Sequence, residues 1–262
     1  MKEFLRYFFG KGDVIEFYHF SLAHFLPILF GALVIGIIYR YRHKIAALKW
    51  ESTLRMGMAF ALIICEMSYY WRLAAMPSLG ANAHEHLPIT VCGWAIIFSS
   101  FMLLNKNQTL FDISYFFVFS GTIFALISPV VIAYTGPTRF RYYQFWGEHL
   151  FGYIAIFYMI FVHKMRPNLK SMLKSYIAMA VLTVIATITN NMLGSPANYL
   201  FMAEPEPTAS ILDYLPKNYF LRMLLMGSVV SVLFVVSYLP WYLKDKKAKK
   251  KELVFTSSFS IS

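Results

Sequence analysis

The sequence predicts an all-α protein, a polytopic membrane bundle of about seven transmembrane helices. Hydrophobic residues make up 58% of the 262-residue chain and charged residues only 14%, whereas soluble domains carry about 25% charged residues. Continuous apolar runs without alternation of polar and apolar side chains predict helices rather than a membrane β-barrel. This composition excludes an ordinary soluble domain, a disordered chain and a coiled coil.

Seven apolar runs approach the roughly 20 residues that a helix needs to cross a bilayer. In chain order they cover Phe20–Tyr39, Met56–Leu73, Leu87–Leu104, Ile113–Tyr134, Phe145–Val162, Met172–Leu193 and Phe220–Leu243. No cleavable signal peptide is expected, because the residues before the first run lack a continuous apolar core. Residues 1–243 are therefore predicted to form one transmembrane domain, and residues 244–262 a basic cytoplasmic tail.

Lysine and arginine set the predicted orientation, because positively charged loops tend to stay in the cytoplasm. With seven spans, sixteen of the 24 basic residues fall on one side of the membrane, six of them between Lys244 and Lys251. The amino terminus is therefore expected outside and the carboxyl terminus in the cytoplasm of a multi-pass cell-membrane protein. The net charge of +11 follows from this topology, and no nucleic-acid partner is expected.

The longest outer loop, about Gly194–Asn218, is expected to form an irregular cap rather than a helix. It contains four prolines among three acidic residues, and proline blocks helical hydrogen bonding. Ordered loops of this length are uncommon in compact domains and often carry function.

Ionisable residues inside membrane spans are costly, so they are the first candidates for function. With the predicted topology they gather in the outer halves of the spans, with Asp112 as the main inner exception. Glu66 lies in the second span, Cys92 about one and a half turns inside the third, and His149 near the start of the fifth. The other polar residues at a similar depth are His19, His24, Arg72, His84, Glu85, His86, Glu148, Asn190 and Asn191. This sorting predicts a site that opens to the outer leaflet.

A cysteine beside a histidine favours acyl transfer through a thioester. The thiolate is the nucleophile, an imidazole can remove its proton, and a carboxylate or amide can orient that imidazole. Cys92 with His149, oriented by Glu66 or Asn191, suits this chemistry. The candidates for the oxyanion donor that acyl transfer needs are Thr90, Asn190 and a backbone N–H group.

Other site chemistries have less support in the sequence. His84 and His86 flank Glu85, but histidines two residues apart do not face the same way on a helix. Pro88 stands where a zinc-protease helix needs its second histidine, so no metal is expected. No cofactor is expected either, and no Walker, Rossmann or serine-hydrolase motif occurs. Cys65 has only apolar neighbours and is interpreted as a packing residue.

Two adjacent segments and several later motifs resemble the YwaF family of bacterial integral membrane proteins. The adjacent segments are Glu66-Met-Ser-Tyr-Tyr-Trp71-Arg72 and His86-Leu87-Pro88-Ile89-Thr90-Val91-Cys92. The later motifs include Leu110-Phe111-Asp112, His149 and Asn191-x-Leu-Gly194 with Asn198-Tyr199-x-Phe201. The resemblance covers about residues 15–243. It departs from the family at residues 89–91, where the usual histidine is absent, and near Ala203-Glu204, where the usual basic residue is absent.

The YwaF family is similar to a eukaryotic transmembrane acyltransferase that remodels ether phospholipids, and more distantly to androgen-induced-gene-type membrane hydrolases. The resemblance implies a catalytic cysteine and histidine, which correspond here to Cys92 and His149. It also implies a bacterial plasma membrane, with phospholipid or lipoprotein acyl chains as partners. The residues expected to contact the substrate are Arg72, His86, Thr90, Asn190, Asn198 and Tyr199.

The sequence therefore favours a membrane acyltransferase or lipid-acyl hydrolase that acts on phospholipid or lipoprotein acyl esters through a Cys92 thioester. Two alternatives stay open. One is a proton-coupled transporter or lipid-binding membrane protein in which Glu66 and the histidines move protons. The other is a non-catalytic partner of another membrane protein, which would bind that protein without turning over lipid.

Overall fold

The computed structural model describes residues 1–11, 17–129, 135–202 and 215–259, with side chains as far as residue 250. Within these residues the regular structure is entirely helical. In chain order the helices are α1 (Lys2–Phe9), α2 (Leu22–Ala46), α3 (Glu51–Ala75), η1 (Pro77–Leu79), α4 (Val91–Asn105), α5 (Gln108–Ile127), α6 (Phe140–Phe161), α7 (Leu169–Leu193), η3 (Tyr199–Phe201) and α8 (Tyr219–Phe259). The predicted all-α class is confirmed.

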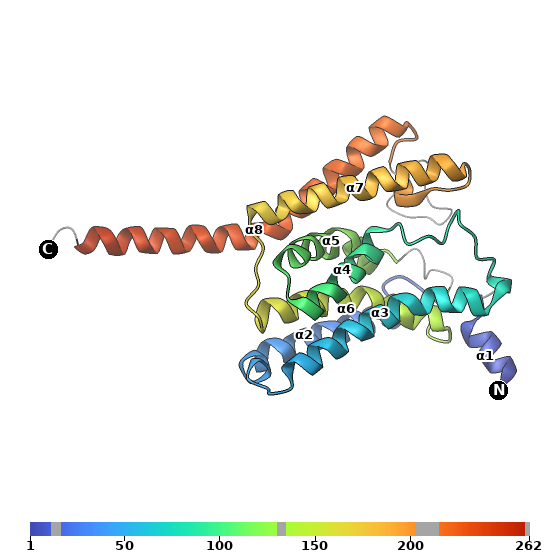
Figure 1. Cartoon of the computed structure of the whole chain (residues 1–262), viewed down its shortest axis with the longest axis horizontal. Helices are drawn as coiled ribbons and strands as arrows, with labels where there is room; N and C mark the ends of the chain where they lie inside the picture. Colours follow the sequence, from blue (N-terminus) through green and yellow to red (C-terminus); the bar gives the residue numbers. More distant parts are fainter. Residues whose placement is uncertain (12–16, 130–134, 203–214, 260–262) are drawn as a thin grey trace.

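Helix α6 lies at the centre of the bundle. It contacts α2, α3, α4 and α5, while α5 continues the packing to α7 and α8 (Figure 1). More than half of the α6 side chains are buried, whereas α7 buries only Ser171, Ser175, Leu182 and Ala186. The helices from α3 to α6 therefore form the core, with α2 on one side and the α7–α8 pair on the other.

The outer helices present long apolar surfaces. Four helical segments in the described residues are long and apolar enough to cross a membrane, namely Leu22–Ala46, Gln108–Ile127, Leu169–Leu193 and Tyr219–Lys250. Exposed aliphatic side chains include Leu29 and Leu33 on α2, Val181 on α7, and Val232 and Val236 on α8. Contiguous apolar surface of this extent is unfavourable in water and is expected against lipid. The chain is therefore a multi-pass membrane protein.

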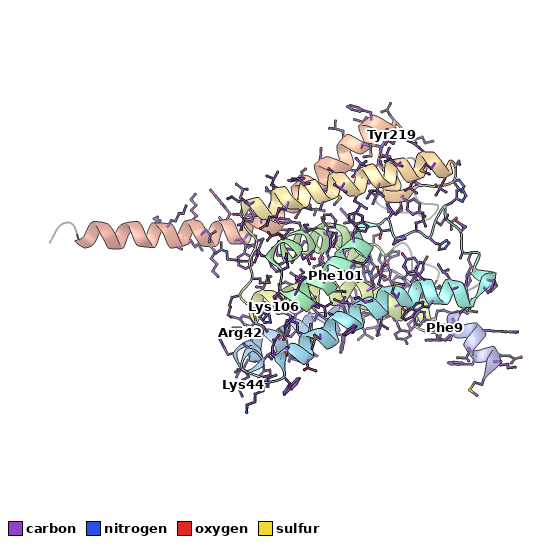
Figure 2. All side chains as sticks on the ribbon, viewed as in Figure 1. Phe9, Arg42, Lys44, Phe101, Lys106 and Tyr219 are labelled. Carbon is purple, nitrogen blue, oxygen red and sulfur yellow. The ribbon has the colours of Figure 1, made fainter. Side chains whose placement is uncertain are left out.

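Basic side chains gather at one end of the bundle. Figure 2 shows Arg42, Lys44 and Lys106 at the end from which the tail of α8 projects, and Phe9 and Tyr219 at the opposite end. The predicted boundary between residues 243 and 244 does not interrupt the chain's helical structure, because α8 runs from Tyr219 to Phe259. The basic tail is thus a continuation of the last apolar helix. The side of the membrane on which it lies stays a prediction.

Local capping sets where α4 begins. The apolar run predicts a helix from Leu87, but α4 starts at Val91. Pro88 disfavours helical backbone in the residue before it, and the Thr90 side chain accepts a hydrogen bond from the Gly93 N–H at 2.9 Å. Such a cap defines a helix start. Cys92 is therefore the second residue of α4, rather than one and a half turns inside a helix as predicted.

The expected outer cap is described only in part. Residues 203–214, which include Glu204, Pro205, Pro207 and Asp213, lie outside the described residues. The preceding part, from Gly194, contains the short η3 helix and a Pro196 that interrupts regular structure. Likewise, α5 ends at Ile127, two residues before Pro129, and the rest of the predicted fourth span up to Tyr134 lies outside the described residues.

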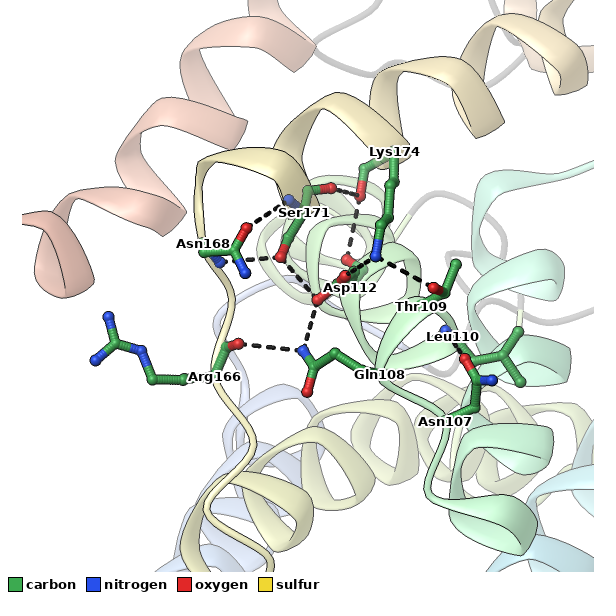
Figure 3. Close-up of polar contacts among 10 residues, drawn as sticks. Asn107, Gln108, Thr109, Leu110, Asp112, Arg166, Asn168, Ser171 and Lys174 are labelled. Carbon is green, nitrogen blue, oxygen red and sulfur yellow. Dashed lines mark hydrogen bonds and ion pairs between the residues drawn. The ribbon is translucent and has the colours of Figure 1, made fainter.

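A polar network surrounds Asp112 at the end of the bundle that bears the basic tail, which is the predicted inner end (Figure 3). The Asp112 side chain is 1% exposed and accepts hydrogen bonds from Gln108 Nε2, Ser171 Oγ and Lys174 Nζ, each at 2.7 Å. Ser175 Oγ donates to the Asp112 backbone carbonyl at 3.1 Å. Because Gln108 and Asp112 belong to α5 and the other three residues to α7, the network joins these two helices.

A second network joins α3 and α6 at the same end. The Glu51 carboxylate accepts hydrogen bonds from the Tyr158 hydroxyl at 2.7 Å and from His163 Nε2 at 2.8 Å. Arg55 donates to Glu51 at 3.2 Å and to the backbone carbonyl of Leu103 on α4. The inner half of the bundle therefore holds more polar structure than the sequence predicted, because α3 begins five residues before the expected span.

The Asp112 network yields a stability prediction. Asp112→Ala should lower the free energy of unfolding by about 3 kcal/mol, because it removes three charge-assisted hydrogen bonds and leaves the buried Ser171 hydroxyl without this acceptor. Thermal unfolding in detergent measures the loss. Asp245→Ala is the control, because Asp245 forms an ion pair with Arg166 in which the side chains are 38% and 44% exposed, and such pairs contribute about 1 kcal/mol or less. Equal decreases in unfolding temperature for Asp112→Ala and Asp245→Ala would contradict the prediction.

Candidate functional site

Two buried carboxyl groups meet beside the start of α4. Glu66 on α3 is 7% exposed and Glu148 on α6 is 9% exposed, and the two side chains lie close enough to interact electrostatically. Like charges repel strongly where water is excluded, so this pair needs a compensating group nearby.

Polar side chains of α6 hold Glu148 in place. Gln144 Nε2 donates to Glu148 Oε2 at 2.8 Å and lies 3.3 Å from the Cys65 backbone carbonyl on α3. Arg141 Nη1 lies 3.9 Å from Glu148 Oε2 and donates to Gln144 Oε1. The Arg141 guanidinium also stacks over the Tyr69 ring at 4.8 Å. Arg141 thus supplies the positive charge that offsets the carboxyl pair.

Glu66 lies directly against the first turn of α4. A Cβ atom on Gly93 would be 3.1 Å from Glu66 Oε1 and 3.0 Å from Thr90 Oγ1, closer than side chains normally pack. Glycine at this position therefore allows the carboxyl group to approach the helix backbone. The amino-terminal end of a helix carries partial positive charge, which favours a carboxylate there. Cys92 is the neighbouring residue, and both carboxyl groups are close enough to act electrostatically on its sulfur.

Cys92 and His149 lie at the same level of neighbouring helices. A Cβ atom on Gly152 of α6 would be 3.3 Å from Ile96 of α4, so the two helices approach closely there. Cys92 precedes Ile96 by four residues, and His149 precedes Gly152 by three, which is one turn in each helix. Glu148, the residue before His149, acts electrostatically on Cys92. The turns that bear Cys92 and His149 therefore lie on the same side of this close approach, and α4 and α6 run in the same direction.

The His149 ring is oriented by the backbone of its own helix. It is buried, and Nδ1 lies 2.8 Å from the Phe145 carbonyl oxygen. A carbonyl only accepts, so Nδ1 carries the proton and Nε2 keeps its lone pair. Nε2 has no hydrogen-bond partner among the described residues. The structure thus assigns the orienting contact to Phe145 rather than to Glu66 or Asn191; Asn191 is exposed on α7, a helix that packs on α5, η3 and α8.

Two of the expected substrate-binding residues tie the outer segments together. The Tyr199 hydroxyl donates to the Ala83 carbonyl at 2.6 Å and accepts from the Leu87 N–H at 2.8 Å. Burial raises the pKa of Tyr199, so the hydroxyl stays protonated and able to donate. Asn190 forms two hydrogen bonds with the Tyr199 backbone, at 2.8 and 3.1 Å. These side chains position the loop that leads into α4.

The other expected substrate-binding residues also have local partners. Arg72 donates to the carbonyls of two residues at the end of α1, at 2.5 and 2.9 Å. The His86 ring stacks on Tyr69 with centroids 6.1 Å apart. Thr90 is exposed as the cap of α4, and Asn198 precedes η3. Contact of these residues with a substrate stays a prediction.

Four residues of this region have no role in the site predicted from the sequence. All four lie on α6, namely Arg141, Gln144, Glu148 and Tyr153. A spacing of four residues relates Gln144 to Glu148 and His149 to Tyr153, which puts each pair on one face of the helix. This periodicity was visible in the sequence. The neighbouring helix that each face meets was not, because it depends on contacts between distant segments.

Comparison with known proteins agrees with a membrane fold. A family model described as the TMEM164 family matches residues 19–242. The comparisons found no matching curated protein and no matching solved structure. The matched region runs from just before α2 into α8, and it includes both carboxyl groups, Cys92 and His149. The chain belongs to the TMEM164 family, a family of transmembrane proteins.

Proposed function

We propose that this protein is a membrane acyltransferase or lipid-acyl hydrolase that forms a thioester on Cys92. The observation that carries the proposal is the His149 imidazole, whose Nδ1 proton is committed to the Phe145 carbonyl, at the level of Cys92. An imidazole held in this tautomer presents Nε2 as a base toward its surroundings. The Cys92 thiol, on the neighbouring helix at the same level, supplies the nucleophile for the nucleophile–base pair that acyl transfer requires.

The reaction proceeds in two balanced halves. His149 Nε2 removes the Cys92 thiol proton, the sulfur attacks the carbonyl carbon of an acyl ester, and the ester C–O bond breaks. The proton on Nε2 passes to the departing alcohol. An acceptor hydroxyl, amine or water then attacks the thioester with His149 as base, and the C–S bond breaks to restore the thiol.

The surroundings support a lipid as the source of the acyl group. The bundle presents apolar surface on α2, α7 and α8, so the protein is expected to be surrounded by lipid acyl chains. The resemblance of the segments around Glu66 and Cys92 to the YwaF family, and through it to the ether-phospholipid acyltransferase, favours phospholipid or lipoprotein esters. It also favours a bacterial plasma membrane. The distribution of lysine and arginine favours an amino terminus on the outside.

The decisive experiment concerns Cys92. After incubation with phospholipid vesicles, the purified protein should gain the mass of one fatty acyl group, and Cys92→Ala should abolish the gain because no sulfur remains to form the thioester. Intact mass spectrometry measures both. Cys65→Ala is the matched control and should acylate normally, because Cys65 lies on α3 with its sulfur 3.5 Å from the Gln144 carbonyl. Retention of the acyl mass in Cys92→Ala would refute the mechanism.

A second prediction tests the contact between Glu66 and α4. Gly93→Ala should slow acylation about 10-fold, because the added methyl group displaces the carboxyl group and the start of α4, and small displacements of reacting groups are costly. Gly57→Ala on α3 is the control, since its Cβ would meet nothing within 4 Å. Quantitative mass spectrometry of the acylated protein over time compares the variants. Equal rates for the two would show that this packing is not needed.

One observation favours a second candidate, a proton-coupled transporter or lipid-binding protein. Glu66 and Glu148 are both buried in a membrane bundle and interact electrostatically, and such groups often lie on proton pathways. A carrier should lose pH-driven uptake into vesicles on Glu66→Gln and keep it in Cys92→Ser. The acyltransferase should instead lose acyl transfer to an acceptor in Cys92→Ser. The two variants therefore separate the candidates.

A further inference from the structure

Tyr153 on α6 has a buried hydroxyl that forms no hydrogen bond within the described residues. Its side chain is 8% exposed. Leaving such a group unpaired costs about 1–3 kcal/mol. Buried polar groups are nearly always paired, so each exception calls for an explanation.

The position of Tyr153 relates it to the reacting pair. It follows His149 by four residues, so both side chains lie on one face of α6. The hydroxyl is close enough to Cys92 for the two groups to interact electrostatically. The ring is held edge-on against Phe119 of α5, with centroids 5.2 Å apart. Its orientation is therefore set by packing rather than by a hydrogen bond.

The Tyr153 hydroxyl proton makes no hydrogen bond within the described residues. The hydroxyl proton of the neighbouring Thr122 does make one. The Thr122 hydroxyl lies next to Tyr153 without an aligned hydrogen bond between them. Thr122 Oγ1 instead donates to the Val118 carbonyl at 2.5 Å. Of these two hydroxyl groups near Cys92, Tyr153 is the one with a proton available for a substrate.

Two oxyanion donors considered from the sequence fit the site less well. Thr90 keeps its hydroxyl proton when it accepts the Gly93 N–H, but it is exposed at the start of α4. The Asn190 amide is bonded through both its oxygen and its nitrogen to the Tyr199 backbone. The buried, unpaired Tyr153 hydroxyl fits the requirement better, because hydrogen bonds to developing charge are strongest where water is excluded.

We propose that Tyr153 is a catalytic residue that donates a hydrogen bond to the oxyanion of the tetrahedral intermediate. The inference rests on the proposed acyl transfer. When the Cys92 sulfur adds to the acyl carbonyl carbon, the π electron pair moves to the carbonyl oxygen, which accepts from the Tyr153 O–H. When the intermediate collapses, the pair returns to the C=O bond and the ester C–O bond breaks. The phenolic proton stays on Tyr153 throughout.

The test compares two reactions of the same sulfur in the full chain carrying Cys65→Ala. Acylation by p-nitrophenyl octanoate passes through an oxyanion, whereas alkylation by iodoacetamide displaces iodide and does not. Tyr153→Phe should slow acylation about 100-fold, the usual effect of losing one such donor, and leave alkylation unchanged. Tyr143→Phe is the control, because Tyr143 is an exposed residue of the same helix. Its acylation and alkylation rates should both equal those of the parent.

Each outcome bears on the proposal. Slower acylation with unchanged alkylation supports it. Equal acylation in the parent and Tyr153→Phe overturns it, as does a parallel loss of both reactions, which would mean that Tyr153 only shapes the site. If the parent itself is not acylated on Cys92, the proposed function fails and this inference fails with it. The unfolding temperature of Tyr153→Phe should equal or exceed that of the parent, because the variant removes an unpaired buried hydroxyl.

Discussion

The contact between Glu66 and Glu148 organises the outer half of the bundle. Two carboxyl groups buried side by side need compensation of their charge. Arg141 and Gln144 provide this compensation from α6, and the contact joins α3 to α6. The first turn of α4 lies against the same pair because Gly93 has no side chain to hold them apart. The helices α3, α4 and α6 are thus held together where Cys92 lies.

The reactive groups are placed on rigid elements around this contact. Cys92 is the second residue of α4. Unpaired backbone N–H groups at a helix amino terminus favour an anion. His149 and Tyr153 lie on one face of α6, the central helix, whose own backbone carbonyl at Phe145 sets the imidazole tautomer. A site built from two buried helices loses little entropy on binding, because its side chains are already held by packing.

Both ends of the bundle are joined by charge-assisted hydrogen bonds, which are about twice as strong as neutral ones. At the end that bears the basic tail, networks around Asp112 and Glu51 join α5 to α7 and α3 to α6. At the opposite end, Arg72 and Arg141 make charged contacts, and Tyr199 adds neutral hydrogen bonds with the loop before α4.

The sequence by itself determined the all-helical membrane class, because the length of an apolar run is set directly by bilayer thickness. From the same runs it predicted a common depth for Cys92 and His149, and a site marked by ionisable residues. The tertiary structure alone decided that Glu148, and not a histidine, meets Glu66, that Phe145 orients His149, and that Asn191 points away on α7. Periodicity defines the faces of a helix, but close packing between segments far apart in the chain selects which faces meet, as Gly93 and Gly152 illustrate.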